Sequence, residues 1–221
     1  HAVNIDQSLD AVEEILGALL DISRLDTGAL KPEFSVFRID DILKQLKVEF
    51  EPIAKARELE FKVLASSLWV RSDRRLLRRL VQNLVSNAIK YTPEGRVLVG
   101  VRRRRGRLTV EVLDTGLGIP SSKQKLIFQE FQRLDQGARI ARGLGLGLSI
   151  VERIGRVLGH PVDLESVPGK GSRFFVDVPT AAAMPDVGPE AGVPRISSTR
   201  FDGMVALCLD NEEKILDGME A

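Results

Sequence analysis

Four polar side chains share one face of a predicted helix and could together bind a phosphorylated nucleotide. They stand at offsets of zero, four, seven and eight residues: Asn83, Asn87, Lys90 and Tyr91. Such offsets return to the same side of a helix. Two carboxamide oxygens can ligate a hard cation, an ammonium group can neutralise phosphate, and an aromatic ring can stack on a base. A solvated polar face would show the same residue types, so the stripe alone leaves both interpretations open.

Two glycine-rich segments lie downstream of this helix. DTGLGIP at 114–120 follows an apolar strand; its glycines permit close approach to a ligand, and Asp114 can accept a hydrogen bond from an exocyclic amine. RGLGLGLSIV at 142–151 runs into a helix, whose N–H groups and dipole favour an anion. This second segment resembles a dinucleotide fingerprint only loosely, because a polar loop precedes it where that motif requires a strand, and we reject that interpretation.

Strands and helices must position these residues. Period-two alternation predicts strands at 34–39, 59–64, 96–103, 107–113, 162–166 and 172–178. Helical periodicity with Asp or Ser caps predicts helices from 40 or 41 to 57 and from 72 or 73 to 90. A third helix is predicted from 146 to 158, after the second glycine-rich segment. The loop at 116–142 is long for a compact domain, and we expect it to act as a lid. The pattern indicates one α/β domain at 34–179.

Segments of different character flank this domain. Apolar residues repeat at heptad spacing near the start of the chain: Ile5, Leu9, Val12, Leu16 and Leu19. The repeat predicts a helix within 1–30 that packs on partner helices and ends at Gly28; packing on its own domain is the alternative. Residues 180–201 are rich in Ala, Pro, Gly and Ser, which predicts a flexible linker, and 202–221 begin with a buried-type strand.

Composition limits the classes of function. The net charge of +1 gives no reason to expect a polyanion-binding protein. A single cysteine, Cys208, excludes an intrachain disulfide and a cysteine-rich metal site, and it fits a cytoplasmic setting. We find no signal peptide and no run of roughly 18 to 20 apolar residues, and we expect a cytoplasmic region of a longer protein, which could itself be membrane-anchored. The basic run at 102–107 lacks interleaved aromatic residues, which favours a solvated hairpin over a nucleic-acid surface.

Five segments occur in the order and approximate spacing of the boxes of sensor histidine kinase catalytic domains: NLVSNAIKYT, DTGLGIP, FQEF, GLGLGLSIV and GKGSRF. The chain from about 34 to 178 resembles this family, which shares a superfamily with gyrase-type and Hsp90-type ATPases. The resemblance implies the Bergerat ATP-binding fold, an α/β two-layer sandwich with helices on one face of a mixed sheet, here preceded by a dimerisation helix. It also implies ATP and Mg²⁺ as ligands.

The resemblance implies a role for each matching residue. Asn87 would ligate Mg²⁺ with Asn83 beside it. Lys90 would contact phosphate, Tyr91 would pack on the nucleotide, and Asp114 would recognise the adenine amino group. The other implied nucleotide-binding residues are Gly116, Gly118, Ile119, Phe128, Phe131, Arg142, Gly143, Leu144, Gly145, Leu146, Gly147 and Ser172. Simple packing within the lid is an equal alternative for the two phenylalanines, and Arg133 competes with Arg142 for a γ-phosphate contact.

Asn83 stands where the ATPases of this superfamily carry a general-base Glu. A carboxamide cannot take a proton from water, so the resemblance implies phosphoryl transfer to a histidine and disfavours hydrolysis. Neither His1 nor His160 matches the acceptor context, and we expect the acceptor outside this chain. Residues 18–30 resemble the end of the dimerisation hairpin. Residues 204–219 resemble the start of a receiver domain, with Asp210 in its acidic pair; a simple C-terminal helix is the alternative.

The implied function is the ATP-binding catalytic core of a two-component sensor histidine kinase. The expected partners are a second copy in the full-length protein and the receiver domain of a response regulator, in the same chain or another, with no nucleic acid. Two alternatives stay open: an ATP-binding scaffold without kinase activity, and a hydrolytic ATPase.

Overall fold

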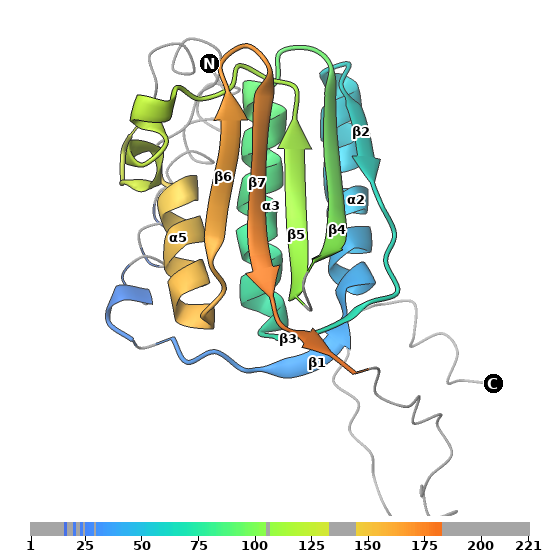
Figure 1. Ribbon diagram of the computed structural model, residues 1–221, viewed down its shortest axis with the longest axis vertical. Helices are drawn as coiled ribbons and strands as arrows, with labels where there is room; N and C mark the ends of the chain where they lie inside the picture. The colour runs from blue at the N-terminus through green and yellow to red at the C-terminus, as the bar shows by residue number, and fades with distance from the viewer. Residues whose placement is uncertain are drawn as a thin grey trace, which may run out of the picture. The chain divides into compact units, whose positions relative to one another are not determined.

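In the computed structural model the chain divides into two units, His1–Met184 and Pro185–Ala221, and the second lies outside the described residues. The described residues are Leu16, Leu20, Ser23, 25–28, 30–104, 107–132 and 145–182. Three helices cover one face of a five-stranded sheet: α2 (Ile39–Ala56), α3 (Arg74–Tyr91) and α5 (Gly147–Leu158) (Figure 1). This arrangement confirms the predicted two-layer α/β sandwich.

The larger sheet is mixed. Its spatial order is β2 (Glu60–Val63), β4 (Arg96–Arg104), β5 (Arg107–Asp114), β7 (Gly171–Val178) and β6 (Val162–Val167). β2 runs parallel to β4, and every other pair of neighbours is antiparallel. A smaller antiparallel sheet has the order β1 (Ser35–Arg38), β3 (Trp69–Ser72) and β8 (Thr180–Ala181).

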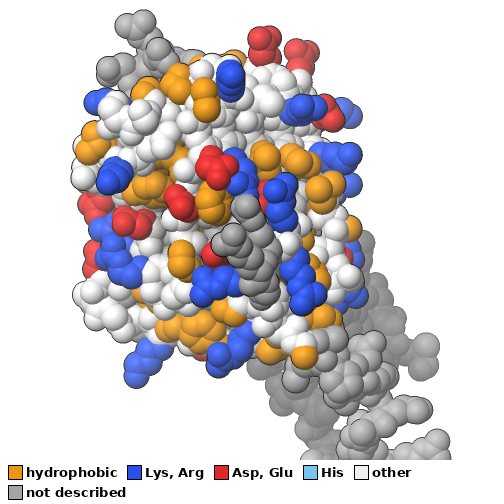
Figure 2. Space-filling model, in the orientation of Figure 1, with side chains coloured by type: hydrophobic (Ala, Val, Ile, Leu, Met, Phe, Trp, Pro, Cys, Tyr) orange, Lys and Arg blue, Asp and Glu red, His pale blue; other side chains and the backbone are white. Residues whose placement is uncertain are grey.

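Alternation along β5 separates the two faces of the larger sheet. Val110 and Val112 are buried in the core, whereas Glu111 between them points to the face without helices. Glu111 is nevertheless only 4% exposed, because Arg173 donates to both of its carboxylate oxygens at 2.7 and 3.2 Å. Figure 2 shows basic, acidic and hydrophobic side chains intermixed on this face. Arg102 belongs to this network, with its Nε 3.6 Å from Glu111 and its side chain 64% exposed.

Burial fixes the rotation of α3 about its axis. Its apolar residues are almost inaccessible to solvent: Leu77, Leu80, Val81, Leu84, Val85 and Ala88. The buried carboxylate of Asp73 caps the helix, and its Oδ1 accepts the N–H groups of Arg75 and Leu76 at 2.9 and 3.0 Å. Its Oδ2 accepts the N–H of Glu33 at 2.8 Å. One side chain therefore joins the start of α3 to the segment that precedes β1.

The predicted elements agree with the observed ones to within about one residue, but three details differ. The N-cap of α2 is Arg38, which makes no side-chain cap bond, so the prediction of Asp40 or Asp41 was wrong. Asp40 lies in the first turn and accepts the N–H of Ser66 at 3.2 Å. β3 was not predicted, because it has only four residues and they show no clear alternation of apolar and polar side chains. β8 extends the sheet structure two residues beyond the predicted boundary at 179.

Several predictions fall on residues that the structure does not describe. They include most of the N-terminal helix, the hairpin tip at Gly106 and the receiver-like segment. Leu25 and Asp26 are helical, and Gly28 follows with a φ of +66°, in agreement with the predicted helix end. The described part of the predicted lid forms two short 3₁₀ helices, η1 (Ser121–Lys123) and η2 (Leu126–Phe128). None of the helices in the described ranges combines the length and apolarity that a membrane span needs.

His160 holds the end of α5 against the smaller sheet. It is 1% exposed, and its Nε2 lies 2.8 Å from the hydroxyl of Ser72 in β3. Burial lowers the pKa of the imidazole, so the neutral form is favoured. This position agrees with a structural role at the turn between α5 and β6.

Replacing Asp73 with Ala should lower the free energy of unfolding by about 2–3 kcal/mol, because three backbone N–H groups lose their buried acceptor. Urea unfolding followed by circular dichroism measures this change. Asp163→Ala, at an exposed aspartate, is the control and should change stability by less than about 0.5 kcal/mol. Equal effects of the two substitutions would contradict the anchoring role of Asp73.

Candidate nucleotide-binding site

Asn83 and Asn87 lie on the edge of α3 that meets the start of α5. A Cβ atom at Gly147, the first residue of α5, would stand 3.3 Å from Oδ1 of Asn83 and 3.5 Å from Nδ2 of Asn87. The Nδ2 group of Asn83 donates to the carbonyl of Arg79 at 2.9 Å, so its Oδ1 is the atom nearest to Gly147. The structure thus brings together three predicted site residues from two distant segments.

The start of α5 presents backbone donors beside these carboxamides. Gly145 has a φ of +73°, and a Cβ atom there would stand only 2.8 Å from the carbonyl oxygen of Gln132. Leu146 is buried, and its carbonyl accepts both the hydroxyl of Ser149 and the N–H of Ile150. The N–H groups of a first helical turn have no partner within the helix, and together with the helix dipole they favour an anion.

Part of the predicted phosphate loop lies outside the described residues. These positions are Arg133, Arg142, Gly143 and Leu144. Their roles stay predictions from the sequence.

Asp114 ends β5 with one carboxylate oxygen committed to the fold. Its Oδ1 accepts the N–H of Gly116 at 2.9 Å and the N–H of Ser172 at 3.1 Å. Neither of these bonds uses Oδ2. Burial raises the pKa of Asp114, while its hydrogen bonds with Gly116 and Ser172 oppose that rise. A fixed acceptor oxygen in a largely desolvated position suits recognition of an amino group.

Gly116 and Gly118 are required by close contacts of the loop after Asp114. A Cβ atom at Gly116 would stand 2.3 Å from the carbonyl oxygen of Tyr91. One at Gly118, where φ is +65°, would stand 2.0 Å from the carbonyl oxygen of Val167. Any side chain at either position would therefore push the loop away from α3 or from the end of β6. Ile119 follows, partly buried against the core.

Lys90 and Tyr91 are half-buried at the C-terminal end of α3. The carbonyl of Tyr91 accepts the N–H of Leu117 at 3.2 Å, so the end of the helix contacts the loop that follows Asp114. The polar stripe of α3 therefore meets Gly147 at one end and this loop at the other. That placement agrees with a ligand that extends along α3, with its phosphates near α5 and its base near Asp114.

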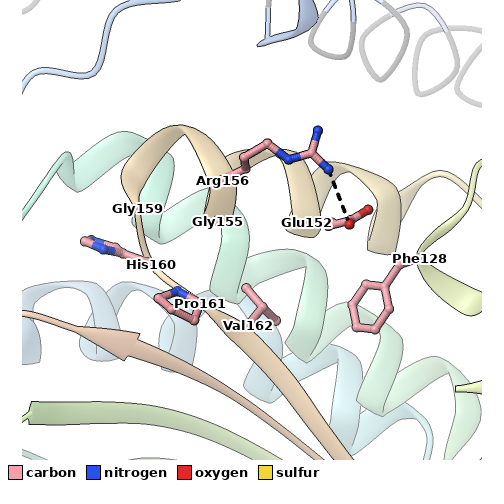
Figure 3. Close-up of a pocket in the computed structure, with 8 residues that line it drawn as sticks. All are labelled: Phe128, Glu152, Gly155, Arg156, Gly159, His160, Pro161 and Val162. Carbon is pink, nitrogen blue, oxygen red and sulfur yellow. Dashed lines mark hydrogen bonds and ion pairs between the residues drawn. The ribbon is translucent and has the colours of Figure 1, made fainter. Parts of the chain in front are cut away.

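The two aromatic residues of the predicted lid behave differently. Phe128 packs edge-to-face on Phe174 with ring centroids 6.5 Å apart, whereas Phe131 is 60% exposed with a φ of +58°. Phe128 also lines a pocket whose other residues belong to α5, the turn after it and the start of β6 (Figure 3). Of the predicted site residues this pocket includes Phe128 alone, so it is separate from the predicted nucleotide site.

Arg153 connects α5 to two other segments, and no sequence motif predicts this role. Its Nε donates to Asp26 at 2.8 Å, and its Nη2 pairs with Glu130 at the end of the FQEF segment. The side chain is only 18% exposed, and the hydrogen bond to Asp26 helps to raise the pKa of its guanidinium. Both acidic residues precede Arg153 in the chain, by 127 and 23 positions, and no local pattern indicates such a pairing.

Comparison with known proteins places these features in context. A family model described as histidine kinase-, DNA gyrase B-, and HSP90-like ATPase matches residues 72–182. The chain is 31% identical to the sensor protein GacS of Pseudomonas syringae pv. syringae, over 98% of this chain and 24% of that protein. It is also 31% identical to the circadian input-output histidine kinase CikA of Synechococcus elongatus, over 87% of this chain and 26% of that protein. The chain thus spans about a quarter of the length of these relatives.

Solved structures show the same fold. Full-length ShkA in complex with AMPPNP matches with a TM-score of 0.72 and 28% identity, over 82% of this chain and 38% of that chain. The nucleotide-free catalytic domain of the histidine kinase ThkA matches with a TM-score of 0.56 and 27% identity, over 66% of this chain and 95% of that chain.

Asp114→Asn should weaken nucleotide binding and leave the fold intact or more stable. Asn can keep both backbone bonds through Oδ1, but Nδ2 then presents a donor where the ligand needs an acceptor. We expect a roughly tenfold to hundredfold loss of affinity for an ATP analogue. Because burial raises the pKa of the Asp114 carboxyl, the ionised group opposes folding, and the neutral variant should have a higher melting temperature at pH 7.

This gain in stability has a defined pH dependence. Protonation of Asp114 removes the cost of burying its charge in the wild type. The difference in melting temperature between Asp114→Asn and wild type should therefore be largest above the raised pKa, and it should disappear as the pH falls towards 3.8, the ordinary pKa of this group. Thermal scans between pH 3.5 and 7.5, at roughly half-unit steps, measure it. A difference that grows on acidification would contradict burial as the cause.

Proposed function

This chain belongs to the family of histidine kinase-, DNA gyrase B- and HSP90-like ATPases and is homologous to the catalytic domains of sensor histidine kinases, and from this we propose its function. The chain is an ATP-binding kinase core. It holds ATP so that the γ-phosphoryl passes to a ring nitrogen of a histidine, and ADP leaves with the electrons of the broken phosphorus–oxygen bond.

The observation that carries this proposal is the position of Gly147 over Asn83 and Asn87. A Cβ atom at Gly147 would lie within about 4 Å of both carboxamides, and Asp114 lies beyond the other end of the same helix stripe. The end of the stripe near Gly147 suits the anionic phosphates of a nucleotide, and the end near Asp114 suits a base with an exocyclic amine. A solvated helix face would give no reason for this convergence.

The carboxamides suit Mg²⁺ as part of a shared coordination shell. Among the described residues no group of three or more His, Cys, Asp or Glu could hold a metal ion. Mg²⁺ typically takes one or two protein oxygens together with waters and substrate phosphates, and Oδ1 of Asn87 with Asn83 beside it fits that requirement. When bound, the ion neutralises charge on the phosphates.

Asn83 also determines which nucleophile the site can use. Its carboxamide donates to the carbonyl of Arg79 and has no basic group that could take a proton from water. Lys90, at the same helix edge, supplies positive charge near the phosphates. The residues of this chain therefore position and neutralise the triphosphate, and they leave activation of the nucleophile to the acceptor.

The acceptor and the partners come from outside the described domain. His160 is buried against Ser72, and neither His160 nor His1 has the sequence context of the acceptor, so we propose a histidine of a dimerisation hairpin as acceptor. In the longer protein we propose a homodimer and transfer onward to the receiver domain of a response regulator. We further propose that this region lies in the cytoplasm, where ATP is available.

Asn87→Ala should abolish the Mg²⁺-dependent part of ATP-analogue binding and reduce phosphoryl transfer to a supplied histidine hairpin by about a hundredfold or more. Fluorescence titration and transfer of label from γ-labelled ATP measure the two effects. Gln45→Ala, which removes an exposed carboxamide from α2, is the matched control and should behave as wild type. Steady phosphate release that survives Asn87→Ala, or binding without transfer, would refute the kinase proposal.

A further inference from the structure

Two side chains outside the predicted set hold the loop that follows Asp114. Ile119 is in this loop, and both of its polar backbone groups bond to side chains. Its N–H donates to the hydroxyl of Ser166 at 2.8 Å, and its carbonyl accepts Nε2 of Gln124 at 3.1 Å. Ser166 lies near the end of β6, and Gln124 follows η1. The conformation of Ile119 is therefore set by residues 5 and 47 positions away.

The hydroxyl of Ser166 uses all of its hydrogen-bonding capacity in this contact. It donates to the carbonyl of Gly171 at 3.0 Å, so it can only accept from Ser172, whose hydroxyl lies 3.0 Å away. With the N–H of Ile119 this makes one donated and two accepted bonds, the full complement of a hydroxyl. An alanine at this position would remove one hydrogen-bond partner from each of three partly buried groups.

Gln124 completes the attachment from the other side. Its Nε2 carries two hydrogens, and they go to the carbonyl of Ile119 at 3.1 Å and the carbonyl of Ser166 at 3.0 Å. The side chain thus joins the loop to the end of β6. A backbone bond from the N–H of Gly169 to the carbonyl of Leu117, at 2.7 Å, runs between the same two segments.

These bonds continue to the carboxylate that recognises the base. Ser172, which shares a hydroxyl contact with Ser166, donates its backbone N–H to Oδ1 of Asp114. A single chain of hydrogen bonds therefore runs from Gln124 through Ile119, Ser166 and Ser172 to Asp114. Displacement of Ile119 would alter the support of Asp114 without removing any predicted ligand-contacting residue.

We propose that Ser166 and Gln124 are positioning residues of the base-binding side of the site: they fix the loop at Ile119, and through Ser172 the orientation of Asp114. The inference rests on the proposed ATP-binding function. Neither residue contacts the ligand, and their effect is on the adenine end alone, because the phosphate end is built by α3 and α5.

The test compares two ligands that share the phosphates but differ in the base. Ser166→Ala and Gln124→Glu should each weaken binding of a fluorescent ATP analogue roughly tenfold, the scale on which supporting hydrogen bonds of ligand-orienting groups act. Tripolyphosphate has no base, and its own dissociation constant can be measured from its displacement of the analogue. After correction for the affinity of each variant for the analogue, this dissociation constant should be the same as in the wild type. Ser166→Thr keeps the hydroxyl and should restore wild-type affinity.

A measurement without nucleotide separates positioning from unfolding. Hydrogen exchange of the Ile119 amide should accelerate far more than that of the β5 amides in Ser166→Ala, and the chain should still unfold in one cooperative transition, at a melting temperature lowered by about 2–8 °C. Gln124→Ala serves as a second variant if Gln124→Glu fails to fold. The matched controls are Ser122→Ala, at an exposed position in the same segment, and Gln45→Glu, at an exposed position in α2, and both should match wild type.

The possible outcomes are distinct. Loss of ATP affinity with unchanged tripolyphosphate affinity and faster Ile119 exchange supports the proposal. Equal loss for both ligands, or unchanged ATP affinity despite faster exchange, overturns it. A folded wild-type chain that binds neither ligand would instead overturn the proposed function, and the inference that rests on it would fall for that reason.

Discussion

The burial of α3 is the constraint on which the rest of the site depends. Its apolar face is packed between the sheet and α5, and residues such as Leu80, Val81 and Val85 are fully inaccessible to solvent. The helix can therefore not turn about its axis without exposing the core, at about 25 cal/mol for each Å² of apolar surface. This fixes the direction of Asn83 and Asn87. Asp73 then fixes the axial position of the helix through its capping bonds.

Around this fixed helix the site is assembled from backbone that approaches closely. The loop after Asp114 reaches the carbonyl of Tyr91 because Gly116 has no side chain, and α5 reaches the carboxamides because its first residue is Gly147. The glycines allow these two segments to approach α3, and hydrogen bonds from neighbouring side chains then hold the segments in place. The two kinds of residue thus have complementary roles. Glycines permit the close approach, and polar side chains whose hydrogen-bonding groups are all in use prevent the segments from moving away.

Much of this could be predicted from the sequence, because the signals were local. Periodicity located the larger strands and the helices to within about one residue, and the offsets of Asn83 and Asn87 indicated a shared helix edge. The order of glycine-rich segments indicated which loops would meet that edge. The contacts of Gln124, Arg153 and Ser166 could not be predicted, because each depends on partners far away in the chain. β3 was missed for the same reason, since its pairing with β1 and β8 defines it more than its four residues do.

The smaller sheet gives the domain a mechanical property. β1 and β8 lie on either side of β3 and both run antiparallel to it, with Ser35 opposite Ser72 and Ala181 opposite Trp69. A force that pulls the chain before β1 away from the chain after β8 would therefore act along the strand axes, in opposite directions on β1 and β8. Such a force would load the hydrogen bonds of both strand pairs in shear. β3 leads directly into Asp73 and α3. Tension from either side of the domain would thus reach the base of the helix that carries Asn83 and Asn87.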